Sequence, residues 1–393
     1  MKEFSPERKT VWIHILICLT AAGCVFGRAL LYGLSLEDRV FLEWGSIHDV
    51  RNFLRFWTAI IGPSVETFSY TPMKTTVLSV LFQGFGFQSF FYHGAALIVH
   101  TFGIVAAYRI ARYFMKDLTA ALCASLLFAV YPLHIAGIVS VAGITDMAGL
   151  VLMMWALYEY LLERDSPQEA AFLRVYILAG LAIFMTEAAL VFPLLLLGHE
   201  IIGRSGSRRM KPALIAGLIT LIYLAGKCLF VISEDQAVIS LAPLSALLNG
   251  LISVIGIGYP QEIAGAFLLG AIGCLVFLLC GIFLLSDEDE KASAVMKTGG
   301  AWMVLSVLPL FLIGNFPVYI TGRYLYFSVF CWCLLFSSLI LMITKRLLND
   351  PVAKRTGIAV LGMFVVFYGV MAFYNVGFFR SPVSFYERLV EIY

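Results

Sequence analysis

Charged residues are scarce in this sequence of 393 residues, since only 13% are Asp, Glu, Lys or Arg, against about 25% in an average soluble domain. Hydrophobic residues make up 61%. The 27 Lys and Arg nearly balance the 25 Asp and Glu, so the chain lacks the basic footprint of a nucleic-acid-binding protein. At about 20 apolar residues per spanning helix, roughly a dozen spans fit in the chain, with little left for a soluble domain. The composition predicts an all-α polytopic membrane protein and excludes a receptor with a single anchor.

Paired cysteines are also missing. The eight cysteines form no Cys-x-x-Cys motif and lie mostly inside apolar runs, so we interpret them as small buried apolar residues rather than disulfide or zinc ligands. His93 and His100 share one face of an expected helix but lack further partners for a metal site. We therefore assign no metal ligand, and a requirement for a divalent cation stays open.

Eleven apolar stretches are long enough to cross a membrane. They lie at about 11–34, 89–114, 118–140, 145–162, 171–185, 187–203, 211–232, 262–286, 298–314, 322–344 and 356–377. A further apolar stretch, 237–261, is broken by Pro243, Asn249 and the Gly-Tyr-Pro at 258–260. It is either a twelfth span or an extracytoplasmic re-entrant or loop segment.

The basic residues decide between these topologies. With the N-terminus in the cytoplasm and 237–261 not crossing, two thirds of the Lys and Arg fall in short inner loops, as the positive-inside rule requires. Counting 237–261 as a crossing would place the basic run 345–355 outside. We therefore predict a single domain, 1–393, with about eleven spans, a cytoplasmic N-terminus and an extracytoplasmic C-terminus.

The longest hydrophilic segment is the first outer loop, 35–88. Within it, apolar residues recur at helical spacing from Ile47 to Ile61, while polar side chains fall largely on the opposite side. This pattern predicts a helix that lies flat in the outer interface or packs on the neighbouring spans.

Ionisable residues at membrane depth are costly and need an explanation. In the predicted topology they gather near the outer face, at Asp38, His134, Asp146, Glu187, Lys227 and Arg323. All of them except Asp38 also have a plain structural interpretation. Asp146 and Glu187 would complement helix N-termini, Lys227 would extend to the interface, His134 would be a satisfied buried histidine, and Arg323 would be an interface anchor.

A carboxylate and an arginine at the same depth suit the transfer of a group from a lipid phosphate. The guanidinium would bind the phosphate through charge-assisted hydrogen bonds. The carboxylate would take the proton of an acceptor hydroxyl as it attacks the sugar. This pattern alone does not distinguish a transferase from a carrier of the same lipid.

The stretch 91–160 contains FYHGAALIVH and AALCASLLFAVYPLHIAGIVSVAGITDMAGL, with a histidine-ended helix, a Pro-x-His turn and a Gly-x-x-Asp. Four further elements stand in order around it, namely Leu36-Glu37-Asp38-Arg39, Tyr70-Thr71-Pro72-Met73, Thr186-Glu187-Ala188 with Pro193, and Arg323-Tyr324-Leu325-Tyr326. In these elements the chain resembles the GT-C superfamily of polyprenyl-phosphate-sugar-dependent glycosyltransferases. The resemblance is to the branch of the protein O-mannosyltransferases and the TPR-bearing O-mannosyltransferases.

The resemblance implies a GT-C-like fold and an inverting transfer of a sugar from a polyprenyl phosphate to a protein or glycan acceptor on the outer face. It implies a catalytic Asp in the first outer loop, which matches Asp38 beside Glu37. It also implies a lipid-phosphate ligand that matches Arg323, and we add Lys227 as a second candidate. The expected substrate pocket is formed by His134, Asp146, Glu187, Tyr324 and Tyr326.

Four positions depart from the pattern: Glu37 stands for Asp, Thr71 for Arg, Ala136 for an acidic residue and Thr186 for Lys. They motivate a second hypothesis, a GT-C-like subunit that has lost catalysis and serves in binding or assembly. A carrier of a lipid-linked substrate is a third. The short chain without an appended domain favours a bacterial or archaeal plasma membrane, and no nucleic-acid partner is expected.

Overall fold

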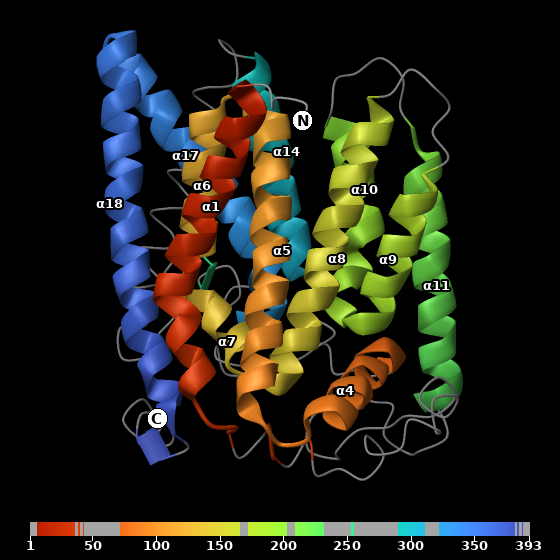
Figure 1. Ribbon diagram of the computed structural model, residues 1–393. Helices are drawn as coiled ribbons and strands as arrows, with labels where there is room; N and C mark the ends of the chain where they lie inside the picture. The colour runs from red at the N-terminus through yellow and green to blue at the C-terminus, as the bar shows by residue number, and fades with distance from the viewer. Residues whose placement is uncertain are drawn as a thin grey trace.

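The computed structural model describes residues 6–35, 38, 39, 42, 71–165, 172–202, 209–231, 253, 254, 290–310, 322–381, 383, 384 and 387. Within these ranges the chain forms helices and connections, without a strand. Its long helices run side by side in one bundle (Figure 1). Six described helices are long and apolar enough to cross a membrane, or seven when one bent pair is counted as a span. The predicted interfacial helix at 47–61, the span at 262–286 and most of 237–261 lie outside the described residues.

The first half of the described chain contains α1 (Pro6–Phe26), η1 (Gly27–Leu31), α4 (Pro72–Phe85), α5 (Ser89–Met115), α6 (Leu118–Ala129), η3 (Pro132–His134), α7 (Ile135–Ile138) and α8 (Val141–Arg164). The second half contains α9 (Leu173–Met185), η4 (Glu187–Val191), α10 (Phe192–Ile202), α11 (Lys211–Val231), α14 (Glu290–Val307), η6 (Gly322–Leu325), α17 (Tyr326–Leu347), α18 (Asp350–Val376) and η7 (Gly377–Arg380).

Most apolar stretches predicted from the sequence coincide with helices, and three differences matter. The structure has a helix, α4, in the last part of the segment predicted as the first outer loop. Helix α8 begins at Val141 rather than at 145, because Ser140 caps it by accepting the Gly143 N–H. Helix α14 begins at Glu290 rather than at 298. The predicted count of about eleven spans is not confirmed.

The predicted span 118–140 is bent. Helices α6 and η3–α7 meet at 47°, because Tyr131 precedes Pro132 and adopts an extended conformation that ends the helix. The bent segment returns against α8 at very short range, since a Cβ added at Gly143 would lie 2.5 Å from the Ala136 carbonyl oxygen. A glycine is required at this contact.

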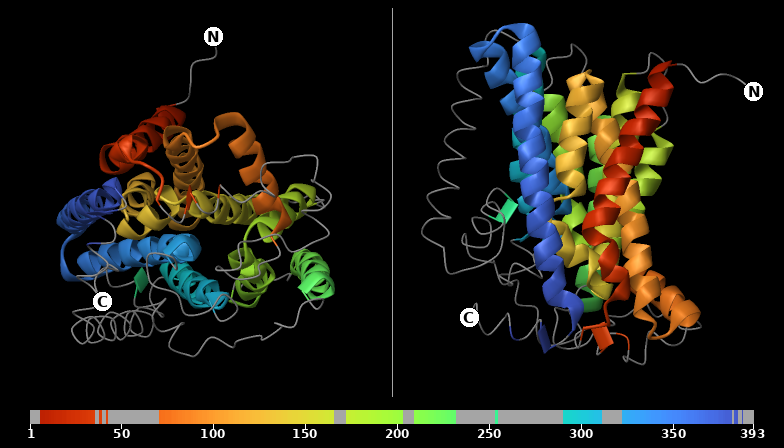
Figure 2. Two further views of the ribbon diagram at one scale, coloured as in Figure 1. Left: turned by 90° about the horizontal axis from the view of Figure 1, so that it is seen from below. Right: turned by 60° about the vertical axis from the view of Figure 1, so that its left-hand side comes forward.

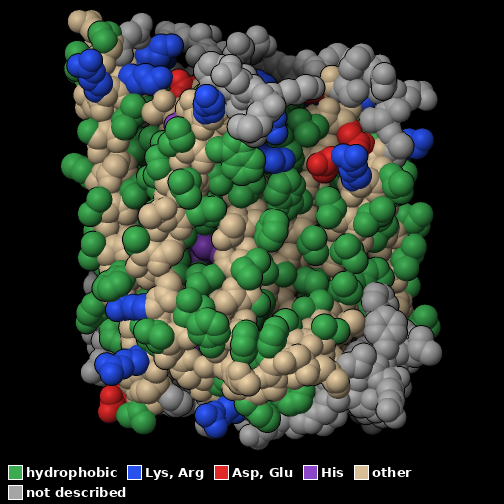
Figure 3. All heavy atoms as spheres, viewed as in Figure 1, with side chains coloured by type: hydrophobic (Ala, Val, Ile, Leu, Met, Phe, Trp, Pro, Cys, Tyr) green, Lys and Arg blue, Asp and Glu red, His purple; other side chains and the backbone are tan. Residues whose placement is uncertain are grey.

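The two ends of the bundle differ. Helix α1 begins at one end, and α18 followed by η7 ends at the other (Figures 1 and 2), which fits a chain whose termini lie on opposite sides of a membrane. Figure 3 shows a broad belt of hydrophobic side chains across the middle of one face, with Lys and Arg gathered mainly toward its upper end. In the predicted topology this upper end is cytoplasmic, and the lower end, where α4 and α7 lie, is extracytoplasmic.

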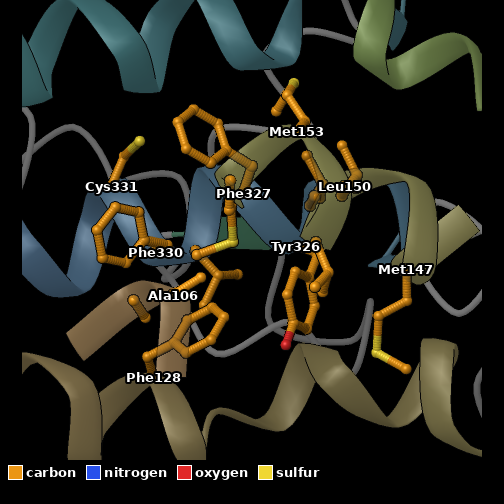
Figure 4. Close-up of a cluster of buried hydrophobic side chains, with 14 of the residues drawn as sticks. Ala106, Phe128, Met147, Leu150, Met153, Tyr326, Phe327, Phe330 and Cys331 are labelled. Carbon is orange, nitrogen blue, oxygen red and sulfur yellow. The ribbon is translucent and has the colours of Figure 1, made fainter. Parts of the chain in front are cut away.

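The centre of the bundle is packed with aromatic and sulfur-containing side chains. Phe128 of α6 and Phe330 of α17 have ring centroids 6.0 Å apart, and both are fully buried. Figure 4 shows them beside Tyr326, Phe327 and residues of α8. This core fixes α6, α8 and α17 relative to one another.

Candidate active site

Asp38 lies after η1 and is held by backbone groups of two segments. Its Oδ1 accepts the Val141 N–H of α8 at 2.8 Å, and its Oδ2 accepts the Ser35 N–H at 3.2 Å. The Ser35 hydroxyl accepts the Asp38 N–H at 3.0 Å. A carboxylate is favourable at this place because the N-terminus of a helix carries partial positive charge. Asp38 is therefore fixed against the first residue of α8.

Burial changes the acid–base behaviour of Asp38. The side chain is 2% exposed, and this burial raises its pKa, an effect opposed by the hydrogen bonds from Ser35 and Val141 and by the nearby His93. Each carboxylate oxygen has room for about two hydrogen bonds. Asp38 thus retains sites at which it can accept a proton.

A buried ion cluster lies one turn further along α8. The Lys74 Nζ of α4 contacts both oxygens of Asp146, at 3.2 and 3.0 Å. The Arg323 Nε of η6 lies 3.1 Å from Asp146 Oδ2. Asp146 is 2% exposed and Arg323 6%, so the three charges interact under weak solvent screening. Two cations, Lys74 and Arg323, thus contact the Asp146 carboxylate.

Close backbone packing brings η6 to α8. A Cβ added at Gly322 would lie 3.2 Å from the Ala136 Cβ and 3.4 Å from the Leu133 carbonyl oxygen. The bent segment η3–α7 therefore forms the surface on which η6 rests, and Arg323 follows directly. Asp146 stands five residues after Val141, which corresponds to about 7 Å along the helix axis, so α8 sets the spacing between Asp38 and the ion cluster.

Tyr324 lies beside the cluster. Its hydroxyl accepts a hydrogen bond from Arg323 Nη2 at 3.2 Å, and the guanidinium carbon lies 5.1 Å from its ring centroid. These contacts orient the arginine side chain. The sequence also allowed Asp146 to be the anionic partner of a helix N-terminus. In the structure Ser140 and Asp38 occupy the N-terminus of α8, so Asp146 does not have that role.

Glu187 and Lys227 form a second ion pair. The Lys227 Nζ lies 2.6 Å from Glu187 Oε1, and the Tyr223 hydroxyl donates to the same oxygen at 3.4 Å. The Lys227 side chain is 28% exposed, whereas that of Glu187 is 8% exposed. The structure thus assigns the two residues to each other and joins η4 to α11.

His134 and Tyr326 lie in a buried aromatic cluster with His100 and Phe128. The His134 Nε2 donates to the Phe128 carbonyl at 2.8 Å, and its ring centroid lies 4.5 Å from that of Tyr326. The His100 Nε2 donates to the Ala129 carbonyl at 3.1 Å, so its Nδ1 accepts the Tyr326 hydroxyl at 2.8 Å. These contacts place His134 and Tyr326 in a buried aromatic cluster.

The sequence pattern did not single out Lys74, and it drew attention to His93 only as a candidate metal ligand. Lys74 stands in the first turn of α4, and only its place after the Thr71-Pro72 helix start could have drawn attention to it. His93 of α5 donates from Nδ1 to the Ile138 carbonyl at 3.2 Å. Its Nε2 is buried and has no hydrogen-bond partner among the described residues. His93 and Asp38 therefore hold the two ends of the same connection, between α7 and α8.

Glu37 lies outside the described residues. Within the described part of the chain, no three His, Cys, Asp or Glu side chains gather as they would around a metal ion.

Comparisons with known proteins yield structural matches alone: neither a protein-family model nor a curated protein matches the sequence. ArnT from Cupriavidus metallidurans, solved with bound undecaprenyl phosphate, matches with a TM-score of 0.54 at 14% identity, over 94% of this chain and 77% of that one. An oligosaccharyltransferase from Archaeoglobus fulgidus, tethered to an acceptor peptide, matches with a TM-score of 0.49 at 13% identity, over 93% of this chain and 55% of that one.

The ArnT match extends over nearly the whole chain, and the apolar helices are those of an integral membrane protein. The protein therefore has a membrane-embedded helical fold similar to that of ArnT.

Proposed function

We propose that this protein is an inverting membrane glycosyltransferase that moves a sugar from a polyprenyl phosphate to an acceptor hydroxyl on the extracytoplasmic face. The observation that carries the proposal is the buried pair of cations, Lys74 and Arg323, which both contact Asp146. Two cations held close together can bind the oxygens of a phosphate group through charge-assisted hydrogen bonds. In this proposal a lipid phosphate binds there.

In the proposed reaction Asp38 is the general base. Its carboxylate takes the proton of the acceptor hydroxyl while the hydroxyl oxygen attacks the anomeric carbon. The bond between that carbon and the phosphate oxygen breaks, and polyprenyl phosphate leaves with the bonding electrons. A single displacement of this kind inverts the configuration of the sugar.

Lys74 and Arg323 bind the donor phosphate in this proposal. Arg323 offers a planar fork of N–H donors that matches phosphate oxygens, and Lys74 adds a point charge. Both would stabilise the negative charge that develops on the leaving phosphate. Glu187 and Lys227 already pair with each other, so Lys74 replaces Lys227 as the second phosphate ligand.

The finer assignments follow the resemblance described above. A mannosyl donor and a protein or glycan acceptor are the substrates that the O-mannosyltransferase branch suggests. A bacterial or archaeal plasma membrane is the proposed location, with the N-terminus in the cytoplasm. ArnT, solved with undecaprenyl phosphate, supports a polyprenyl phosphate as the lipid.

One observation favours a second candidate, a GT-C-like subunit without catalysis. Both oxygens of Asp38 accept backbone N–H groups, which is also what a purely structural carboxylate would do. In that case the chain would bind the lipid phosphate and release nothing.

The test is release of polyprenyl phosphate from a panel of radiolabelled polyprenyl-phosphate sugars, with the purified protein in lipid nanodiscs. We expect one donor to be cleaved, and Asp38→Asn to lower the rate by about 10²–10⁴-fold, the usual contribution of a general base. Asn keeps the size of the side chain and an oxygen that can accept the Val141 N–H, so the protein should remain folded.

A control variant, Glu200→Gln, removes a buried carboxylate that bonds Arg164 near the other end of α8. It should retain most of the activity. Substantial release by Asp38→Asn would move the role to Glu37 or refute the mechanism. Donor binding without release by the wild-type protein would favour the subunit without catalysis.

A further inference from the structure

A charged cavity lies at the opposite end of the bundle from Asp38. It has a volume of about 660 Å³ and is formed by the first turns of α1 and the last turns of α5 and α8. The positive-inside rule predicts that this end is cytoplasmic. Lys and Arg side chains gather toward this end of the face that contains α1, α5 and α8 (Figure 3).

The lining of this cavity is strongly basic. It contains Arg8, Arg109, Arg112 and Lys116, against the single carboxylate of Glu7. Glu7 pairs with Arg112, and Arg109 and Lys116 add further positive charge to the lining. A basic lining of this kind suits an anionic ligand.

Aromatic rings hold two of these cations in place. The Arg109 guanidinium carbon lies 5.1 Å from the Trp155 ring and 5.6 Å from the Tyr158 ring, both on α8. The Lys116 Nζ lies 4.5 Å from the Tyr113 ring centroid. Contacts of this kind orient a cation and leave its hydrogen-bond donors available. Arg109 and Lys116 are therefore fixed at the membrane surface with donors to offer.

The remaining wall of the cavity is apolar. Val11, Trp12 and Ile15 of α1 and Leu162 of α8 line it, and Trp12 is 54% exposed. A ligand that fits this lining has an anionic group joined to hydrocarbon, because the cations and the apolar side chains belong to one cavity. Basic pockets between spanning helices on the cytoplasmic side bind anionic lipid head groups in this manner.

We propose that this cavity is a binding site for an anionic glycerophospholipid of the cytoplasmic leaflet. Arg109 and Lys116 bind the phosphate, and the acyl chains lie along Val11, Trp12, Ile15 and Leu162. The cytoplasmic leaflet is rich in such lipids and carries a negative surface potential. The site joins α1 to α5 and α8 at the end of the bundle that is remote from the donor phosphate.

A second cavity at the same end provides the comparison. It has a volume of about 530 Å³, is largely apolar, and is lined by residues of α6, α14, α17 and α18. In this cavity the Lys354 Nζ lies 2.8 Å from Asp117 Oδ2, so Lys354 already has an anionic partner. The control variant combines Lys345→Gln with Arg355→Gln. It removes two exposed positive charges near this second cavity, as many as the test variant removes, and leaves the proposed lipid site unchanged.

The experiment measures the thermal unfolding midpoint of the delipidated full chain in detergent, titrated with phosphatidylglycerol or with phosphatidylcholine. The test variant combines Arg109→Gln with Lys116→Asn, because Asn tolerates the left-handed backbone of residue 116 at φ 54°. We expect phosphatidylglycerol to stabilise the wild-type protein and the control variant, and phosphatidylcholine to do so far less. The apparent affinity of the test variant should fall about thirtyfold, since each cation contributes about 1 kcal/mol toward an anionic lipid.

Native mass spectrometry of each protein, purified from membranes, gives an independent reading. The wild-type protein should retain more phosphatidylglycerol than the test variant does. Three results would overturn the proposal: equal stabilisation by the two lipids, equal weakening in the control and test variants, or no response of the wild-type protein. The last result would favour an acidic segment of a partner protein as the occupant.

Discussion

Lys74 on α4 donates to both carboxylate oxygens of Asp146 on α8, at 3.2 and 3.0 Å, although the two residues stand 72 positions apart in the chain. The contact ties a helix in the last part of the predicted first outer loop to a buried span of the bundle. Arg323 shares the same carboxylate, so Asp146 is the point at which three separate segments meet.

Removal of Asp146 should destabilise the protein more than removal of Lys74. Asp146→Asn leaves two buried cations close together without the carboxylate between them, and breaking a buried pair costs about 3–5 kcal/mol. Lys74→Met leaves one cation on one carboxylate and an apolar stem of similar length, which should cost clearly less. Thermal unfolding of both variants and of the double variant measures the difference. Equal losses would mean that the two cations do not share Asp146.

Arg323→Lys should weaken donor binding about tenfold or more while the protein stays folded. A lysine ammonium is a point charge and does not reproduce the bidentate fork of a guanidinium. Titration of nanodisc-embedded protein with polyprenyl phosphate measures the change in Kd. Arg355→Lys, which replaces an exposed arginine at the other end of the bundle, serves as the matched control. An unchanged Kd in Arg323→Lys would return Arg323 to the role of an interface anchor.

The pH dependence of transfer should reveal the burial of Asp38. A general base works in its deprotonated form, so the rate rises with pH as the base loses its proton. Burial raises the pKa of Asp38 above its usual value of 3.8, and the acidic limb of kcat/KM should therefore lie above that pH.

The Ser35 side chain, in addition to its backbone N–H, lowers the pKa of Asp38, so Ser35→Ala, which removes the hydroxyl, should move this limb to still higher pH. A limb at or below pH 3.8 in the wild-type protein, or one that Ser35→Ala leaves in place, would contradict the assignment of Asp38.

Gly103→Ala should destabilise the protein by about 1–3 kcal/mol, the usual cost of overpacking a core. An added Cβ would lie 2.1 Å from the Tyr326 hydroxyl oxygen and 2.9 Å from the ring carbon that bears it, so Tyr326 would have to leave its hydrogen bond with His100. Gly23→Ala, on the exposed side of α1 with nothing within 4 Å, should not destabilise the protein. Unfolding midpoints of the two variants compare them directly.

The limits of the long spans were predicted well because residues at the helix ends determine them. Helix α5 ends at Lys116, whose left-handed conformation terminates it, and α6 begins where the Asp117 carboxylate accepts the N–H groups of Thr119 and Ala120. The bend before Pro132 also had a local signal in the Tyr-Pro pair. The sequence pattern indicated a Pro-x-His turn there, but 118–140 was still predicted as one span because its hydropathy shows no break.

The ion cluster was not predictable in the same way. The sequence placed Asp146 and Arg323 near one face, but it did not show that they touch, and it did not single out Lys74. Their contact depends on Gly322 and Gly143, where close backbone packing brings η6 and the bent segment onto α8. Such proximity is a property of tertiary packing, which hydrophobic periodicity in a single sequence does not encode.

The pairing of two cations, Lys74 and Arg323, at Asp146 has a kinetic consequence if the proposed reaction is correct. The donor is a phosphodiester with one negative charge, whereas the released polyprenyl phosphate is a monoester whose charge approaches two at neutral pH, as for other phosphate monoesters. Lys74 and Arg323 would therefore hold the spent lipid more tightly than the fresh donor. Turnover would then be limited by departure of the carrier lipid, and added polyprenyl phosphate would act as a competitive inhibitor.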